Sequence, residues 1–133
     1  MCSITAERLY RAFADRDLDG LRAVLAEGFV GEVSAGMPLG VGGRHDGPEA
    51  MLRDVWLPVF GVYDVTPVPV AMTAAADGTV VVRGWYRGSV RATGQAMEAE
   101  FVHVLGVEGD RVTSLRQVTD TACWPRPVAA GPG

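Results

Sequence analysis

The sequence predicts an α+β fold, with short helices first and a curved antiparallel sheet after them. Apolar residues recur at helical spacing as far as residue 60, whereas the segments after residue 66 are rich in valine and aromatic residues, which favour strands. Hairpin turn signals separate these later segments; they are Asp77-Gly78, Thr93-Gly94 and Glu108-Gly109-Asp110. Helices on one face of a bent sheet bury that face and tend to leave an apolar hollow between the two layers.

Three helices are predicted in the first half of the chain. Residues 4–16 carry apolar side chains at helical spacing, and residues 18–27 do so again. Asp17 suits the N-cap of the second helix, and Gly28 suits its stop. The third helix, over residues 48–60, opens on a proline at a favoured first position and carries a broad apolar stripe. A second proline near its end is expected to kink or end it.

Five strands are predicted, one of them ahead of the third helix. This short strand covers residues 29–34, and the glycine-rich stretch 35–47 after it is expected to be a loop. Four strands follow the third helix as a meander, and they span residues 66–74, 79–90, 96–107 and 111–121. Two prolines near the start of the first of these four place it at a sheet edge.

Length and composition fit one soluble globular domain. The chain has 133 residues, of which 48% are hydrophobic and 21% charged. The domain is expected over residues 1–124, and the proline- and glycine-rich residues 125–133 are expected to form a flexible tail. The formal charge is −4 and no basic run is present, which argues against a nucleic-acid partner. No apolar run approaches the roughly 20 residues of a membrane span, so no membrane partner is expected.

The cysteines, the histidines and the absence of nucleotide-binding motifs predict neither a metal nor a cofactor. Cys2 and Cys123 are too sparse for a disulfide framework and lack metal-ligand spacing, so a reducing cytoplasm is the expected location. Two histidines without a clustered set of carboxylates argue against a metal site. The sequence contains no Walker-type phosphate loop, no dinucleotide fingerprint and no GxSxG elbow, and nothing in it asks for a cofactor.

Three stretches of the chain, spread over nearly its whole length, carry a family resemblance. The first contains Asp17-Leu18-Asp19-Gly20-Leu21, the second contains Gly43-Arg44-His45-Asp46-Gly47-Pro48-Glu49-Ala50, and the third contains both Phe101-Val102-His103-Val104 and Leu115-Arg116-Gln117-Val118-Thr119-Asp120. In this order they resemble the SnoaL-like polyketide cyclase branch of the nuclear-transport-factor-two-like superfamily, which includes ketosteroid isomerase. The resemblance implies a cone-shaped, mixed and mainly antiparallel sheet covered by three N-terminal helices. It also implies an apolar pocket inside the cone and a homodimer formed through the outer face of the sheet.

The resemblance implies several possible activities, because a fold does not determine function. The superfamily includes polyketide cyclases, ketosteroid isomerase, epoxide hydrolases and cyclases, dehydratases, and proteins that only bind or scaffold. The three catalytic positions of ketosteroid isomerase are occupied here by Leu9, Val33 and Val102, which argues against classical steroid isomerisation. Limonene-type epoxide hydrolases carry an aspartate where Gln117 stands, and an amide cannot act as a general base.

SnoaL-type cyclases use a histidine on the penultimate strand and an aspartate on the last one. His103 matches the histidine and is the leading candidate for acid–base catalysis, because imidazole titrates near neutrality. The aspartate aligns with Gln117, while Asp120 lies three residues further along the chain. Either residue is a candidate orienting or second polar group, although Asp120 equally suits a cap after the last strand. Alternation along 96–107 leaves open which face looks inward, and the ketosteroid isomerase alignment favours the face without the histidine.

Six further residues are candidates for contact with a substrate. Tyr10, Trp56, Phe60 and Trp85 suit the wall of an apolar pocket, with core packing as the alternative for Trp56 and Phe60 and a dimer interface for Trp85. Arg83 holds an acidic substrate group if it faces inward, or forms a cross-strand ion pair if it faces outward, which is the favoured placement. Glu32 is a reserve base on the first strand.

These residues favour a cofactor-free acid–base enzyme of bacterial secondary metabolism, of the kind found in antibiotic biosynthesis. It is expected to act on a polyketide-like or other apolar cyclic intermediate by cyclisation, isomerisation or dehydration. The absent aspartates motivate a first alternative, which is a non-catalytic binder of small molecules or an accessory dimer. A second alternative is an epoxide hydrolase or cyclase.

Overall fold

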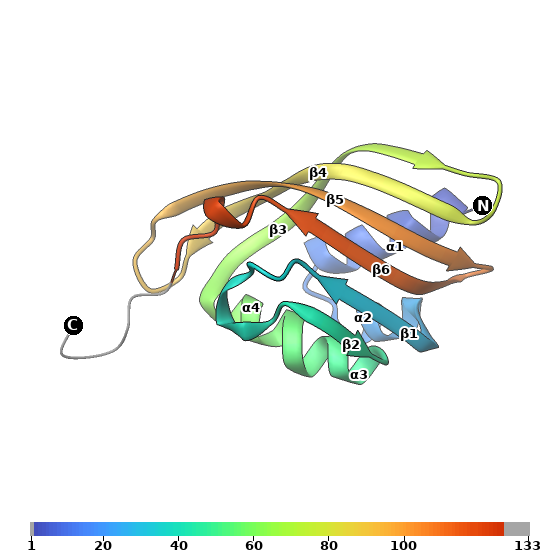
Figure 1. Cartoon of the computed structure of the whole chain (residues 1–133), viewed down its shortest axis with the longest axis horizontal. Helices are drawn as coiled ribbons and strands as arrows, with labels where there is room; N and C mark the ends of the chain where they lie inside the picture. The colour runs from blue at the N-terminus through green and yellow to red at the C-terminus, as the bar shows by residue number, and fades with distance from the viewer. Residues whose placement is uncertain (1, 127–133) are drawn as a thin grey trace.

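A strongly curved sheet of six strands forms the frame of the molecule in the computed structural model, which describes residues 2–126 (Figure 1). The spatial order is β2-β1-β6-β5-β4-β3, and the strands are β1 (Leu25–Val33), β2 (Gly43–Asp46), β3 (Tyr63–Ala74), β4 (Thr79–Val90), β5 (Ala96–Glu108) and β6 (Arg111–Thr119). Strands β1 and β6 run parallel, and every other neighbouring pair is antiparallel. The predicted mixed, mainly antiparallel sheet is therefore confirmed.

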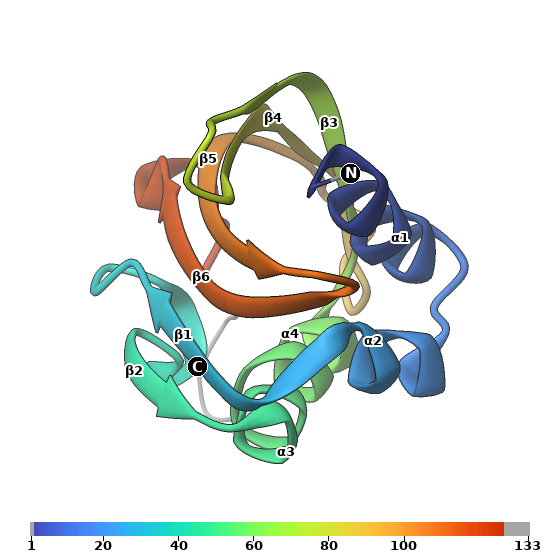
Figure 2. The ribbon, with the colours of Figure 1, turned by 90° about the vertical axis from the view of Figure 1, so that its right-hand side faces the viewer.

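Three helical segments cover the concave side of this sheet, as predicted. They are α1 (Cys2–Ala14), α2 (Leu18–Val24) and a third segment made of α3 (Pro48–Met51), the wider π-type turn η2 (Leu52–Trp56) and α4 (Leu57–Val62). Seen from its end, the sheet curls into an arc, with α1 across the open side and the other helices below (Figure 2). None of the described helices is long and apolar enough to cross a membrane.

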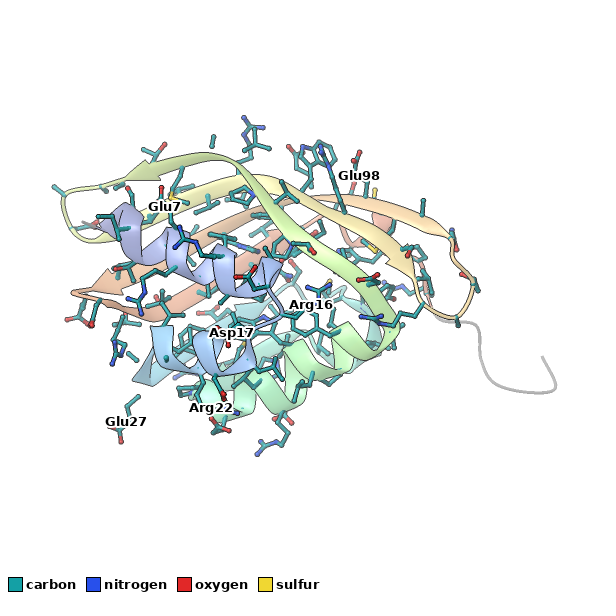
Figure 3. All side chains as sticks on the ribbon, turned by 180° about the vertical axis from the view of Figure 1, so that it is seen from behind. Glu7, Arg16, Asp17, Arg22, Glu27 and Glu98 are labelled. Carbon is teal, nitrogen blue, oxygen red and sulfur yellow. The ribbon has the colours of Figure 1, made fainter. Side chains whose placement is uncertain are left out.

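An ion pair joins α2 to α3, and a side-chain hydrogen bond joins the end of α1 to the sheet; the arginines that form them, Arg22 and Arg16, are labelled in Figure 3. Arg22 on α2 bonds Glu49 at the start of α3, with 2.5 Å between Nε and Oε2. Arg16, which follows α1, donates from Nη2 to the backbone oxygen of Val65 on β3 at 2.6 Å. These contacts lie at the rim of the helical layer and leave its inner side to apolar packing.

The second helix and the first strand meet earlier than predicted. The helix ends at Val24, and β1 begins at Leu25, whereas the sequence pattern extends the helix to residue 27. Leu25 is buried and has an extended backbone, with φ −87° and ψ 137°, because it pairs with Val112 on β6. A contact this distant in sequence leaves no local signal, so the apolar run looks like a continued helix.

Two further elements differ from the predicted ones. Residues 43–46 form strand β2, paired with the free edge of β1, although the predicted element was a loop. An edge strand needs only backbone pairing on one side, so its glycine-rich sequence carries no strand pattern. The third helical segment continues through Pro58 to Val62, because the π-type turn before the proline adjusts the helix without ending it.

Strand β3 is an edge strand, as its prolines predict, and it presses closely on β4. A side chain at Gly84 would collide with the backbone oxygen of Val68, and one at Gly88 would collide with that of Asp64. Glycine is therefore required at both positions for the close backbone approach. This approach lets β3 curl over β4 and helps to close one side of the cone.

The core lies between the helices and the concave face of the sheet, called here the inner face. Burial alternates along β5 without a break, and its inward side chains are Met97, Ala99, Phe101, His103, Leu105 and Val107. Glu100, Val102 and Val104 therefore point to the other side, called here the outer face. The face of β5 favoured by the ketosteroid isomerase alignment was thus the wrong one, and His103 faces inward.

Candidate functional site

His103 lies at the centre of a buried polar cluster on the inner face. Its side chain is 2% exposed, its Nδ1 is 2.8 Å from Oη of Tyr10, and its Nε2 is 2.6 Å from Oη of Tyr86. Tyr10 comes from α1 and Tyr86 from β4, so the imidazole is hydrogen-bonded to the helix on one side and to the sheet on the other. A neutral imidazole has one N–H and one lone pair, so one phenol donates to the ring and the other accepts from it.

Aromatic packing fixes the plane of the imidazole. Phe101 and His103 occupy alternate positions on β5, and their ring centroids are 4.0 Å apart at an interplanar angle of 18°. The ring of Tyr10 is also nearly parallel to the imidazole, with centroids 5.9 Å apart. Residues two apart on a strand point the same way, which is why the sequence Phe101-Val102-His103 produces this stack.

The cluster is electrically neutral at physiological pH. Burial lowers the pKa of His103 to about 3, because the imidazolium ion would lose its hydration. Burial raises the pKa of Tyr86 and of Tyr10, and proximity to Tyr86 raises that of Tyr10 further. The three side chains therefore act as neutral hydrogen-bonding groups, and any proton transfer among them starts from the neutral forms.

Gln117 completes the cluster from β6, where it lies directly opposite His103 in the strand register. Its Nε2 donates to Oη of Tyr86 at 2.8 Å. Its Oε1 accepts from the backbone N–H of Ser34 at 3.3 Å. The amide thus links the end of β1 to the buried phenol. Gln117, a predicted orienting or second polar group, therefore bonds a tyrosine side chain.

The cluster borders an apolar cavity of ≈ 40 Å³ inside the cone. The polar residues that line it are His103, Tyr86 and Gln117, and most of the wall is apolar, including Phe13, Met37, Met51, Trp56, Phe60 and Leu115. None of the described lining residues carries a carboxylate. A volume of this size holds roughly three waters. A larger ligand therefore enters only if wall side chains move, and flexible methionines suit such movement.

The predicted wall residues divide into two groups. Trp56 and Phe60 line the cavity, and both also pack edge-on against Phe13 of α1. Tyr10 lies behind the imidazole rather than on the cavity wall. Trp85 is on the outer face of β4, so its predicted place in the pocket wall is corrected.

Arg83 and Glu32 also point away from the cavity. Arg83 shares the outer face with Trp85, and its Nη1 is 3.9 Å from Oε2 of Glu100, which is the favoured cross-strand pairing. Glu32 is exposed on β1, between Arg44 of β2 and Arg116 of β6 in the strand register. Its neighbours Gly31 and Val33 are the buried ones, so strand alternation turns the Glu32 carboxylate outward, away from the predicted role of reserve base.

Asp120 is not a partner of His103. It is exposed and caps the short helical turn η3 (Thr121–Cys123), accepting from the N–H of Ala122 at 3.2 Å. The strand ends at Thr119, so the chain has already turned away from the cavity at Asp120. The structure therefore supports the capping alternative, and the imidazole of His103 bonds Tyr10 and Tyr86 instead.

Two site residues were missed by the sequence analysis. Tyr86 follows from strand parity, because an outward Arg83 implies an outward Trp85 and an inward Tyr86. Trp124 lines the cavity from beyond the last strand and is 2% exposed. It is the last residue of the predicted domain, and Pro125 after it accepts a hydrogen bond from Tyr63. Most of the predicted flexible tail, residues 127–133, lies outside the described residues.

The described residues offer no evident metal site. Among residues 2–126, no three or more His, Cys, Asp and Glu side chains gather closely enough to hold an ion. The polar side chains at the cavity wall supply one phenol, one imidazole and one amide, from Tyr86, His103 and Gln117.

Known proteins share this fold. An NTF2-like protein of unknown function from Burkholderia pseudomallei has a TM-score of 0.81 and 28% identity, over 91% of this chain and 92% of that one. IdmH from Streptomyces antibioticus, a proposed polyketide cyclase, has a TM-score of 0.79 and 23% identity, over 92% and 94%. TerC, co-crystallised with polyporic acid, has a TM-score of 0.80 and 23% identity, over 91% and 92%. No curated protein matches the sequence significantly.

A family model assigns the chain more directly. The model of the SnoaL-like domain matches residues 6–115, which include most of α1, all of α2 and the third helical segment, and most of the sheet. The match agrees with the resemblance drawn from the sequence motifs and with the likeness to NTF2-like structures. The chain belongs to the SnoaL-like domain family.

Proposed function

We propose that this protein is a cofactor-free acid–base catalyst that activates the carbonyl group of an apolar cyclic, polyketide-like compound. The observation that carries the proposal is the Tyr86–His103 pair at the wall of an apolar cavity. A phenol that is neutral at physiological pH is a strong hydrogen-bond donor to a developing enolate, and a dry site strengthens the bond. The fold likeness to IdmH, a proposed polyketide cyclase, supports the substrate class.

The proposed reaction begins with loss of a proton from the carbon next to the substrate carbonyl. The C–H bond breaks as a hydroxide ion or a buffer base from the solvent takes the proton, and the enolate oxygen accepts a hydrogen bond from the Tyr86 hydroxyl. Return of a proton at a different carbon completes an isomerisation. Attack of the enolate carbon on a second carbonyl of the same molecule closes a ring, and that oxygen takes up the proton. His103 holds the Tyr86 hydroxyl in place through the 2.6 Å hydrogen bond between Nε2 and Oη.

A second candidate function is binding without turnover. It is favoured by the small cavity and by the absence of a carboxylate base among the described lining residues. Epoxide opening is not proposed, because it needs a carboxylate to activate water and Glu32 and Asp120 both lie away from the cavity.

Deuterium exchange into 1-tetralone tests the catalytic proposal with a defined ketone. The protein is expected to accelerate exchange at the carbon next to the carbonyl in D₂O, as followed by proton NMR. Tyr86→Phe is expected to lower the protein-dependent rate by about 100-fold, because it removes the donor to the enolate oxygen. His103→Phe is expected to lower it by at least about tenfold, since Tyr86 loses its support.

Tyr63→Phe is the matched control, because Tyr63 is a buried tyrosine whose hydroxyl bonds the backbone oxygen of Pro125 instead. It is expected to keep the wild-type exchange rate. A folded Tyr86→Phe protein with unchanged exchange contradicts the proposal. Binding of 1-tetralone with no acceleration by the wild-type protein supports the binding function in its place.

We also propose that the protein is a homodimer paired through its outer face. Val81 and Trp85 lie on the outer face of β4, where Val81 is 41% exposed, and Val118 lies on the same face of β6 and is 50% exposed. Exposed apolar side chains gathered on one face favour a protein partner. Glu98, which projects away from the helices in Figure 3, forms an ion pair with Arg87, and such pairs would surround the contact.

Mass measurement by light scattering tests the dimer. The wild-type protein is expected at twice the chain mass of 14.1 kDa, and Trp85→Glu is expected to shift it to the monomer mass. Ile4→Glu changes an exposed apolar residue on α1 and is expected to leave the mass unchanged. A wild-type protein that is monomeric at tens of micromolar refutes this proposal.

A further inference from the structure

The end of β1 fixes the orientation of the Gln117 amide. The backbone N–H of Ser34 can only donate, so the Gln117 atom 3.3 Å away from it is the acceptor Oε1. The Ser34 hydroxyl donates to the backbone oxygen of Gln117 at 3.0 Å and accepts from the N–H of Thr119 at 3.2 Å. These three bonds hold the two strands together at this point. The amide nitrogen Nε2 is therefore turned toward Tyr86.

Tyr86 consequently receives one hydrogen bond whose direction is known. An amide NH₂ group has no lone pair to offer, so Nε2 of Gln117 donates to Oη of Tyr86 at 2.8 Å. The second neighbour of that oxygen is Nε2 of His103 at 2.6 Å. Whether Tyr86 donates to the imidazole or accepts from it depends on which ring nitrogen carries the proton.

Tyr10 decides between the two imidazole tautomers. Its hydroxyl is buried, and Nδ1 of His103 is its one hydrogen-bond partner among residues 2–126. If Nδ1 carried the proton, the hydroxyl proton of Tyr10 would face no acceptor in an apolar core, and a buried donor left without a partner is unfavourable. If Tyr10 donates to Nδ1, the imidazole proton is on Nε2 and points to Tyr86.

The tautomer with the proton on Nε2 leaves the hydroxyl proton of Tyr86 without a protein acceptor. This proton, however, lies at the cavity wall. Tyr86 lines the cavity, whereas Tyr10 does not. The cavity of ≈ 40 Å³ has room for a water or for the oxygen of a ligand beside Tyr86. The Tyr86 hydroxyl proton can therefore bond a water or a ligand oxygen in the cavity. The Tyr10 hydroxyl proton would have no such acceptor.

We infer that the hydrogen bonds run one way, from Tyr10 through His103 to Tyr86, and that Tyr86 offers its own proton to an acceptor oxygen in the cavity. The matching ligand is an apolar molecule with a ketone carbonyl or an enolate oxygen. Gln117 is a positioning residue, because its N–H donates to a lone pair of the Tyr86 oxygen and so leaves the hydroxyl proton of Tyr86 to point into the cavity. The catalytic meaning of this ligand class rests on the proposed function, whereas the proton positions do not.

Nitrogen-15 NMR of the imidazole side chains tests the direction in the unmodified protein. The chain has two histidines, and a His45→Ala variant assigns their signals. The expected result is a His103 ring with its proton on Nε2 and a bare Nδ1. A proton on Nδ1 overturns the inference, because Tyr86 would then donate to the imidazole instead of to the cavity.

The carbonyl stretch of carbon-13-labelled 1-tetralone tests the donor itself. The stretch is expected at lower frequency when the ketone is bound to the wild-type protein than when it is bound to Tyr86→Phe. Gln117→Glu is expected to remove the frequency shift, since a carboxylate accepts the Tyr86 proton and turns it away from the ligand. The proton on Nε2 of His103 is expected to stay in this variant. Tyr63→Phe is expected to keep the shift.

Comparison with tetralin, which has the same rings without the carbonyl, measures the contribution of this bond to affinity. The ketone is expected to bind about tenfold more tightly than tetralin to the wild-type protein and equally to Tyr86→Phe. Equal binding to the wild-type protein overturns the inference. A carbonyl shift without accelerated exchange contradicts only the proposed catalysis, and accelerated exchange with a proton on Nδ1 contradicts only this inference.

Discussion

Replacing Trp124 by alanine is expected to lower the free energy of unfolding by about 3–5 kcal/mol, although the residue follows the last strand. Its indole is 2% exposed and packs edge-on against Tyr63 and Tyr86, with ring centroids 5.1 and 5.0 Å away. Its Nε1 donates to Oγ1 of Thr119 at 3.2 Å. The substitution leaves a large void beside the cavity, and side chains fixed to the sheet fill such a void only in part.

Urea unfolding followed by circular dichroism measures this loss. Arg126→Ala is the control, because it removes the hydrogen bond from Nη2 to the backbone oxygen of Gly36 and keeps the indole. It is expected to cost less than about 1 kcal/mol, since the side chain is exposed. Equal losses in the two variants would show that Trp124 acts only by tethering the chain, not by filling the wall.

Trp124→Ala is also expected to widen the cavity next to the Tyr86 hydroxyl. Anthrone, a three-ring ketone, should then bind more tightly relative to 1-tetralone than it does to the wild-type protein. Trp124→Phe keeps most of the volume and should preserve the wild-type preference. The ratio of the two dissociation constants therefore reports on wall volume independently of stability. An unchanged ratio in Trp124→Ala would place the size limit elsewhere, for example at Phe60.

Local signals explain which parts of the fold could be predicted from the sequence. The hairpin turns at Asp77-Gly78 and Glu108-Gly109-Asp110 join neighbouring strands, and such turns have their own residue preferences. The pairing of Leu25 with Val112 and the strand over residues 43–46 depend on contacts distant in sequence. No short window of sequence contains those contacts, so a helix end and a loop were predicted there instead.

The candidate site shows the same limit. Alternation along 96–107 indicates two faces but not which one the helices cover, and only the tertiary structure shows that His103 is inside. Once Arg83 is assigned outward, parity identifies Tyr86 as an inward residue, so this part of the site was within reach. Trp124 was not, because a proline-rich sequence gives no sign that an indole folds back onto the sheet.

Acid is expected to destabilise the wild-type protein more than a His103→Phe variant. The pKa of His103 is about 3 in the folded protein, and that of an unfolded histidine is about 6.5. Between these values the unfolded chain binds a proton that the folded chain does not, so stability falls as the pH falls. This one group lowers the free energy of unfolding by about 1.4 kcal/mol per pH unit in that window. Phenylalanine cannot bind the proton, so the stability difference between the two proteins should change by about 3 kcal/mol in favour of the variant between pH 7 and pH 4.

Urea unfolding at several pH values measures that difference, and Leu105→Ala is the matched control. Leu105 is buried on the same face of β5, two residues from His103, so its truncation destabilises the core while the imidazole stays. Its deficit relative to the wild-type protein is expected to be the same at pH 7 and pH 4. A His103→Phe difference that is equally constant would mean that the folded protein accepts the proton readily. The imidazole would then be open to water, and the dry, neutral chain from Tyr10 to Tyr86 would lose its physical basis.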